Sequence, residues 1–407
     1  MPNNNMLIAQ SGGPTMVINQ SLAGAVLTAR KHKQIGTILG AKHGIQGILN
    51  RDFVNLSNIS QTQMKAIAQT PSSALGSVRR KPTPEDCKAI FDVIAEQDIG
   101  YFFYIGGNDS AETVHIIHEA ALKAGSPLRC FHIPKTIDND LRENDHTPGF
   151  ASAARFVACA FMGDDLDSRA LGGVKVNIVM GRHAGFLTAA AALARTNPGD
   201  GPHLIYLPER PFSIETFTTD VQAMYKRHGR CLIAVSEGIA DEKGEAIAAR
   251  FSKEVDSHGN KQLSGTGSLG DFLASEIKAR TGIGRVRADT FGYLQRSFPG
   301  IASTVDSKEA YAVGEAAVLA AVKGTTSGSI AIRRQKGATY AVNYEPVPLR
   351  KVARETRHMP DAYINKAGND VTAAFLRYFT PLVGPLPKTA RLFLPITSSH
   401  RACQFQF

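Results

Sequence analysis

Cysteine is scarce in this sequence, and it is never arranged in pairs. The chain of 407 residues has five cysteines, and no two of them form a CxxC motif. An odd number of widely spaced cysteines does not build a disulfide framework, and zinc-finger spacing is also missing. Reduced thiols in a cytoplasm are the simplest interpretation. The five are Cys87, Cys130, Cys159, Cys231 and Cys403.

Long apolar runs are missing as well. The first ten residues, MPNNNMLIAQ, lack the basic and apolar regions of a secretory signal. The most apolar predicted helix, GFLTAAAALA, is far too short to cross a bilayer. We therefore predict a cytoplasmic protein without a membrane anchor.

Positive charge is in excess but dispersed. The formal net charge is +10, and the densest basic run, Arg30–Lys33, closes a predicted helix, where cations suit the helix dipole. No aromatic RNA-binding motif and no long basic tail is present. We therefore predict no nucleic-acid partner, and the charge is compatible with small anionic ligands.

What the sequence does have is the pattern of an α/β protein. Strand-like runs such as Tyr101–Ile105 and Cys231–Ser236 alternate with amphipathic helices such as Ser110–Gly125. This alternation predicts mainly parallel sheets covered by helices on both faces. The length predicts two domains. In such sheets, ligands bind beyond the carboxyl ends of the strands.

Glycines, carboxylates and arginines follow these predicted strands, a combination that indicates phosphate chemistry. Each position also has an ordinary explanation: Asp138 alone is more typical of a turn aspartate that bonds its own backbone. A lone arginine is more often a solvated surface residue. The groups after the strands are Ser11–Pro14, Gly106–Ser110, Pro134–Asp140, Met180–His183, Glu237–Gly238 and Arg296.

Seven motifs in a fixed order carry more information than any one of them. They are SGGPTMVINQSL, ALGSVRR, IGGNDS, PKTIDND, MGRHAG, SEG and FGYLQR, and they span Ser11 to Arg296. This ordered set resembles the phosphofructokinase family. The resemblance implies phosphoryl transfer to the 1-hydroxyl of fructose 6-phosphate. It also implies two similar Rossmann-like three-layer domains, an active site in the cleft between them, and a homodimer or homotetramer.

The resemblance also divides the chain. We expect a phosphoryl-donor domain of residues 1–149 plus about 296–345, and a sugar-phosphate domain of residues 150–295. Residues 346–407 form a C-terminal extension that we expect to pack on the outside. Residues 243–270 are poorly patterned and are interpreted as a connection.

Site residues are carried over from the family by position. Asp138 is implied as the general base, with Thr136 and Asp140 beside it and Arg182 as a further catalytic residue. The residues implied for sugar-phosphate binding are Thr136, Asp138, Asp140, Met180, Gly181, Arg182, Glu237, Arg287, Tyr293 and Arg296. Of Arg287 and Arg296, one usually reaches the site from a neighbouring subunit.

The resemblance also implies that the phosphoryl donor binds in the cleft opposite the sugar phosphate. Gly12 and Gly13 let the backbone approach a phosphate, and Arg79 contacts the transferred group through a permanently charged fork. The implied donor-binding residues are Gly12, Gly13, Arg79, Gly107, Asn108, Asp109, Ser110 and Lys135. Magnesium is the implied cofactor, held by Asn108 and Asp109 directly or through water.

Two departures from the family pattern matter. An arginine seven residues before Met180 is replaced by Gly173, so either Lys175 substitutes for it or the contact is lost. This keeps sedoheptulose 7-phosphate open as an alternative acceptor. Asp109 and Lys135 stand where ATP-dependent members have small residues, and the pair resembles the pyrophosphate-dependent branch.

Charge supports the pyrophosphate interpretation. A carboxylate about 4 Å from a phosphate charge costs on the order of 4 kcal/mol at an effective dielectric near 20. We therefore predict pyrophosphate as donor. An ATP-dependent kinase and a non-catalytic sugar-phosphate sensor are the alternatives, and the intact Asp138, Arg79 and Arg182 argue against the sensor.

Overall fold

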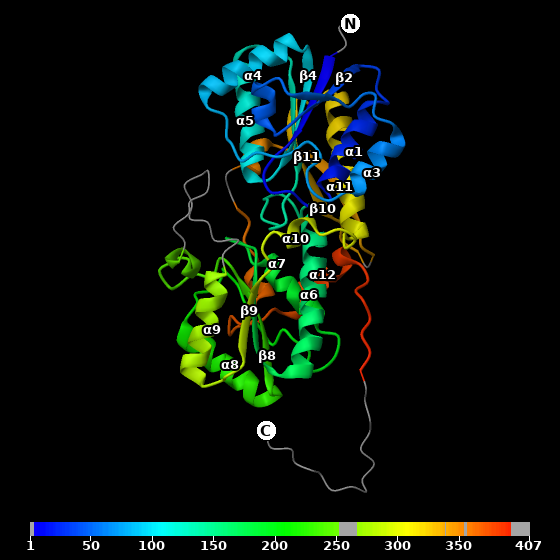
Figure 1. Ribbon diagram of the computed structural model, residues 1–407. Helices are drawn as coiled ribbons and strands as arrows, with labels where there is room; N and C mark the ends of the chain where they lie inside the picture. Colours follow the sequence, from blue (N-terminus) through cyan, green and yellow to red (C-terminus); the bar gives the residue numbers. More distant parts are fainter. Residues whose placement is uncertain (1–3, 252–266, 338, 354–355, 392–407) are drawn as a thin grey trace, which may run out of the picture.

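The computed structural model shows two halves, each built around one β-sheet (Figure 1). It describes residues 4–251, 267–337, 339–353 and 356–391. Cys403 and the middle of the predicted connection, residues 252–266, lie outside the described residues. No helix in the described ranges is long and apolar enough to cross a membrane.

The first half contains a seven-stranded sheet in the order β11-β10-β5-β4-β1-β2-β3. The inner strands are parallel, whereas the edge strands β3 and β11 pair antiparallel to their neighbours. The bounds are β1 Asn4–Gln10, β2 Ile35–Ala41, β3 Phe53–Asn55, β4 Ile99–Gly106, β5 Arg129–Pro134, β10 Ser327–Arg334 and β11 Val342–Val347.

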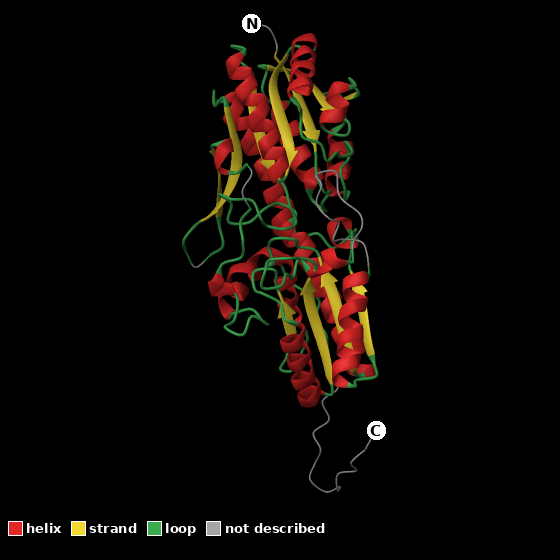
Figure 2. Ribbon diagram, turned by 90° about the vertical axis from the view of Figure 1, so that its left-hand side faces the viewer, coloured by secondary structure: helices red, strands yellow, loops and turns green. Residues whose placement is uncertain are grey.

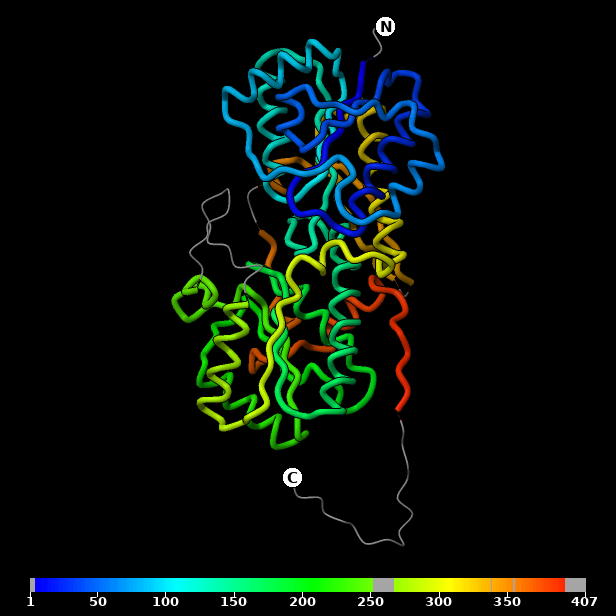
Figure 3. Tube along the Cα trace, in the orientation of Figure 1, coloured from blue at the N-terminus to red at the C-terminus, as the bar shows by residue number. Residues whose placement is uncertain are grey.

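The second half contains a four-stranded, fully parallel sheet in the order β7-β8-β6-β9. Its strands are β6 Gly173–Val179, β7 Leu204–Tyr206, β8 Arg230–Ser236 and β9 Val286–Thr290. After β9 the chain returns to the first half, where the yellow helix α11 precedes β10 (Figure 3). The first half is therefore assembled from both ends of the sequence.

Helices cover both faces of each sheet. In the first half, α1, α3 and α11 pack on one face and α4 and α5 on the other, and each face buries its own apolar core. In the second half, α6 covers one face, and α8 and α9 cover the other.

The α-helices are α1 Ile18–Ala29, α2 Ile45–Leu49, α3 Gln61–Gln69, α4 Pro84–Glu96, α5 Asn108–Lys123, α6 Phe150–Leu171, α7 Phe186–Ala189, α8 Ile214–His228, α9 Ser268–Thr281, α10 Leu294–Ser297, α11 Thr304–Val322 and α12 Ala373–Val383. The 3-10 helices are η1 Ala190–Ala194, η2 Ile247–Arg250, η3 Leu349–Lys351 and η4 Asp361–Tyr363.

The predicted α/β architecture with mainly parallel sheets is confirmed, and the local differences have physical causes. Helix α6 was not predicted: its buried stripe is made largely of small and polar residues, and its N-cap is Gly149, which offers no side-chain cap. Strand β9 ends at Thr290, because the chain turns at Gly292 with φ +53° before α10. The domain boundaries stay a prediction.

The C-terminal extension does not simply lie on the outside, so that expectation is wrong for α12. Phe375 and Phe379 of α12 are fully buried in the core of the second half, where the Phe379 and Phe150 rings lie 4.8 Å apart. The local sequence of this segment, which is interrupted by prolines, does not predict that it contributes to a core. Its aromatic residues become core residues because α6 presents a complementary apolar face.

Candidate active site

The carboxyl ends of the strands of the two sheets face one another (Figure 2). A cavity of about 300 Å³ lies among the loops that follow these strands. Loops from both halves line it, as the position of ligand sites in parallel sheets predicts. The predicted residues that line it are Gly12, Gly13, Arg79, Gly107, Asn108, Asp109, Ser110, Lys135, Thr136, Asp138, Asp140, Met180, Arg182 and Glu237. The remaining lining residues are Ser11, Val78, Arg80, Tyr104, Thr113 and His183.

The glycine turn after β1 is packed closely against cations. Gly12 has φ +72°, and a Cβ atom built on it would lie 3.2 Å from Nζ of Lys135. A Cβ atom on Gly13 would lie 2.8 Å from Nη1 of Arg296. Larger residues would therefore displace Lys135 and Arg296 from the turn, and glycine keeps the backbone N–H groups accessible to an anion.

Lys135 is a buried cation beneath the glycine turn. Its side chain comes from the end of β5, and Nζ donates a hydrogen bond of 2.6 Å to the carbonyl oxygen of Gly13. Burial, with the charges of Arg296 and Arg79 adding to it, lowers the pKa of Lys135 to about 7. An anion bound nearby would favour its charged form.

The turn after β5 brings two carboxylates together. Burial raises the pKa of Asp138 to about 7, and the neighbouring charges of Asp140 and Glu237 add to the effect. Oδ2 of Asp140 accepts a hydrogen bond of 3.0 Å from Asn108. Between the aspartates, Asn139 has φ +58°, a left-handed conformation that asparagine tolerates better than most residues. A carboxylate with a raised pKa in a cleft is a candidate general base.

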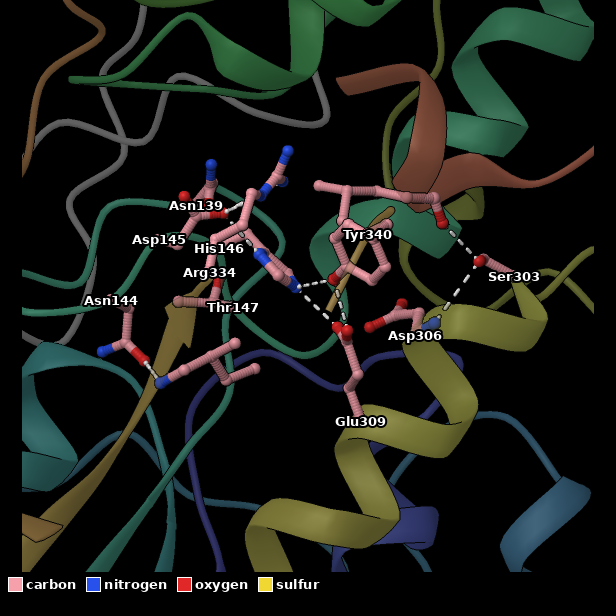
Figure 4. A network of polar contacts seen from close by, with 12 residues as sticks. Asn139, Asn144, Asp145, His146, Thr147, Ser303, Asp306, Glu309, Arg334 and Tyr340 are labelled. Carbon is pink, nitrogen blue, oxygen red and sulfur yellow. Dashed lines mark hydrogen bonds and ion pairs between the residues drawn. The ribbon is translucent and has the colours of Figure 1, made fainter. Parts of the chain in front are cut away.

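A polar network supports this turn from behind (Figure 4). His146 donates 2.8 Å and 2.5 Å hydrogen bonds to Asp145 and Glu309, and Glu309 also accepts from Tyr340. Burial opposes the charge of His146, but the two carboxylates outweigh it and raise its pKa. The imidazolium therefore ties α11 to the segment that follows the turn of Asp138 and Asp140, the predicted catalytic turn.

The second half supplies the opposite wall. Met180, Gly181 and Arg182 follow β6, and the buried Glu237 follows β8. The backbone N–H of Gly181 donates a hydrogen bond of 3.4 Å to the Glu237 carboxylate. The guanidinium of Arg296 stacks 4.2 Å from the centre of the Tyr293 ring. Tyr293, Arg296 and Gly181 thus lie next to the cavity lining, although they are not part of it.

Lys175 and Arg287 lie elsewhere. They are partners in the β6–β9 register, away from the cavity, and Lys175 pairs with Asp289. Gly173 begins β6 with φ +88°, and a Cβ atom there would lie 2.7 Å from the Arg285 carbonyl oxygen. The structure therefore does not bring Lys175 or Arg287 into the site of their own chain.

Sequence reasoning missed Lys81, which makes an ion pair with Asp109, a largely exposed residue of the cavity lining. We call this exposed edge of the lining the mouth of the site. Nζ of Lys81 lies 2.9 Å from Asp109 and 2.7 Å from Glu112, both in α5. The only signal in the sequence was that Lys81 directly follows ALGSVRR. Asp109 is thus engaged by a lysine, and the charge that faces a donor is smaller than that of a lone carboxylate.

The arrangement so far is a cleft with a glycine turn, permanent cations and a carboxylate turn that faces a second wall. The family model described as "Phosphofructokinase" matches residues 5–321. The chain belongs to the phosphofructokinase family.

Proteins similar to this chain match it over nearly its whole length. A pyrophosphate–fructose 6-phosphate 1-phosphotransferase of Rhodospirillum rubrum is 55% identical over 95% of this chain and 96% of its own length. One of the same name from Xanthomonas campestris is 40% identical, over 94% and 92%. The crystal structure of a pyrophosphate-dependent phosphofructokinase from Marinobacter aquaeolei has a TM-score of 0.84 at 33% identity, covering 99% of this chain and all of that one.

Proposed function

We propose that this phosphofructokinase transfers a phosphoryl group from pyrophosphate to the 1-hydroxyl of fructose 6-phosphate, reversibly, giving fructose 1,6-bisphosphate and phosphate. The observation that carries the choice of donor is the buried Lys135 ammonium beneath the glycine turn, with the Asp109–Lys81 ion pair at the mouth. Together they fill space that a longer donor needs. The names of the three similar proteins support the same choice.

In this mechanism the chain positions charge and moves one proton. Asp138 accepts the proton of the sugar 1-hydroxyl. The hydroxyl oxygen attacks one phosphorus of pyrophosphate, the bond from that phosphorus to the bridging oxygen breaks, and phosphate leaves. Arg79 and Arg182 stabilise the charge of the transferred group from opposite walls of the cavity. Gly12, Gly13, Gly107, Ser110 and Lys135 hold the donor. Thr136 and Asp140 flank the base, and Met180, Gly181 and Glu237 bind the sugar.

Magnesium fits the residues present. Asn108 Oδ1 is buried and has no hydrogen-bond partner in the described part of the chain, and Asn108 already contacts Asp140. A hard oxygen beside a carboxylate suits Mg²⁺, which keeps several waters and binds substrate phosphates. We propose that Asn108 holds the ion, with Asp109 acting directly or through a water molecule. When bound, the ion neutralises charge on the phosphates.

Removal of magnesium gives a direct prediction. With pyrophosphate and fructose 6-phosphate, excess chelator is expected to lower the rate by at least about a hundredfold, because the donor charge is then not neutralised. Adding Mg²⁺ beyond the chelator should restore the rate. A coupled assay across a magnesium titration measures this, and full activity without any divalent cation would contradict the assignment.

One assay tests the proposed function as a whole. Initial rates are measured with pyrophosphate or ATP as donor against fructose 6-phosphate, sedoheptulose 7-phosphate and other sugar phosphates. We expect the highest kcat/KM for pyrophosphate with fructose 6-phosphate. Preference for another acceptor would replace the sugar, and preference for ATP would replace the donor. No turnover with any pair would favour a sugar-phosphate sensor.

We also propose that the enzyme is a homodimer or homotetramer. Lys175 and Arg287 are adjacent in the β6–β9 register, with Arg287 exposed and both outside the cavity of their own chain. Cations in that position can reach the sugar phosphate of a neighbouring subunit. Arg296 binds it from within the same chain, beside Tyr293.

Loss of these arginines should weaken sugar binding more than catalysis. Arg296→Ala and Arg287→Ala are each expected to raise KM for fructose 6-phosphate by about 10- to 100-fold, because a hydrogen bond to a charged group is worth roughly 1.5–3 kcal/mol. Steady-state kinetics with saturating pyrophosphate measures the change. If KM is unchanged in both variants, the sugar site is misplaced.

A further inference from the structure

The C-terminal extension reaches the back of the catalytic turn. Thr356 forms an antiparallel bridge with Leu141, and the backbone N–H of Arg357 donates a hydrogen bond of 2.7 Å to the Asp140 carbonyl oxygen. Residues more than two hundred positions apart in sequence therefore run side by side here. The extension thus lies directly behind the two aspartates.

The guanidinium of Arg357 is committed to the backbone of this turn. Nη2 and Nε donate to the Asn139 carbonyl oxygen at 2.9 Å and 3.2 Å. Nη1 donates to the Asp145 carbonyl at 2.6 Å and also to that of Asn144. The planar group lies 4.8 Å from the centre of the Phe186 ring. The planar guanidinium has several N–H donors in a fixed geometry, so it can bond several carbonyl groups at once. The single ammonium group of a lysine cannot do this.

The residue held by Arg357 is the one whose backbone conformation is unusual. Asn139 sits between Asp138 and Asp140 with φ +58°. Its side chain donates a 3.0 Å hydrogen bond to the hydroxyl of Tyr378, in α12. A left-handed non-glycine residue costs free energy and persists where its surroundings hold it. Here the C-terminal extension holds both its carbonyl group and its side chain.

The next two residues of the extension hold the opposite wall. Nδ1 of His358 donates a 2.8 Å hydrogen bond to the carbonyl oxygen of His183, which lines the cavity. The N–H of Met359 donates at 3.0 Å to Glu209, whose same oxygen accepts from Gly185 at 2.8 Å. Three consecutive residues thus connect the catalytic turn with the loop after β6.

We propose that Arg357 is a positioning residue for the reaction: it holds Asn139 in its left-handed conformation, so that Asp138 is aimed at the sugar hydroxyl. This inference rests on the proposed function. Arg357 touches no reacting atom. Its effect is therefore exerted through Asp138, and it should appear in kcat rather than in binding.

Two variants test the proposal. Arg357→Ala removes the donors, whereas Arg357→Lys keeps the charge and most of the stem but not the fork. We expect both to lower kcat by about 10- to 100-fold, the loss that a small misplacement of a catalytic group causes. KM for both substrates should stay within about threefold. Circular dichroism and thermal unfolding establish which variants are folded, and the lysine variant serves if the alanine variant is not.

Arg155→Ala is the matched control. Its guanidinium also donates to carbonyl groups of the extension, at Val383 and Pro385, at 2.9 Å and 2.5 Å. Among the described residues, Arg155 makes no hydrogen bond or ion pair with the turn of Asp138 and Asp140, so kcat of this variant should stay within about twofold of wild type. A loss of kcat in this variant equal to that of Arg357→Ala would show a general effect of loosening the extension, and would overturn the proposal.

The decisive measurement combines Arg357→Ala with Asp138→Asn. If Arg357 acts through Asp138, the added change should lower the residual kcat by less than about twofold, because groups that act as a unit are not additive. Multiplied losses, or a folded Arg357 variant with normal kcat, would overturn the proposal. Wild-type turnover of pyrophosphate and fructose 6-phosphate is measured alongside. Its absence would instead refute the proposed function.

Discussion

Replacing Asp138 by asparagine is expected to lower kcat by about two to four decades, the usual loss when a general base is removed. The half-buried carboxylate lines the cavity beside Lys135 and Thr136, and an amide of nearly the same shape does not accept the proton. KM for fructose 6-phosphate should change by less than about threefold. Steady-state kinetics of the purified variant measures both constants. A folded variant with near-normal kcat would remove Asp138 from the mechanism.

The pH profile is an independent readout of the same residue. Burial, together with Asp140 and Glu237, raises the pKa of Asp138 to about 7, and the base works only when it is ionised. In wild type, kcat/KM should therefore fall as the pH drops below about 7, by roughly tenfold per pH unit. The residual activity of Asp138→Asn should lack this acidic limb. An unchanged limb in that variant would assign the titration to another group.

Replacing Asp109 and Lys135 together by glycine is expected to raise kcat/KM for ATP by about two decades, while pyrophosphate use falls. A lone carboxylate near a phosphate would account for about three decades, but Asp109 is largely exposed and pairs with Lys81, which screens its charge. Lys135 acts by bulk, because it fills the space under Gly12 and Gly13.

Each single change should do less, for a reason visible in the contacts. With Asp109→Gly, Lys81 is still held by Glu112 at 2.7 Å and Lys135 still fills its place. With Lys135→Gly, the Asp109–Lys81 ion pair still crosses the mouth. Initial rates with each donor are compared for wild type, both singles and the double, with KM for the sugar as control. An unchanged donor preference in the double variant would show that these residues are not its cause.

Local sequence patterns were sufficient for most of the fold. The strands β1, β4, β5, β6, β8 and β10 are short apolar runs bounded by glycine and polar turns, and their signal depends only on neighbouring residues. Helix α6 was not predicted, because alanines, Ser152 and Asp165 form much of its buried face and weaken the apolar periodicity. The edge strands β3 and β11 were not predicted, because β3 has only three residues and β11 contains Pro346, a residue that argues against a strand.

For the candidate site too, local sequence patterns predicted one part of the arrangement and missed another. Motifs at strand ends placed Gly12, Lys135, Asp138 and Arg182 at one cavity, because parallel strands gather their carboxyl ends at one edge of a sheet. The family resemblance, and not this pattern, added Lys175 and Arg287 to the expected site. The structure instead places these two beside each other on β6 and β9, because they lie within the strands and not at their carboxyl ends.

The sequence by itself determined the class of fold, the order of the motifs and the family resemblance, since each is written in short stretches of chain. Only the tertiary structure decided that Lys81 pairs with Asp109, that Phe375 and Phe379 complete a core, and that Arg357 holds Asn139. These contacts join residues distant in sequence. No local periodicity records them, because the partner of each side chain is set by how the two halves and the C-terminal extension pack.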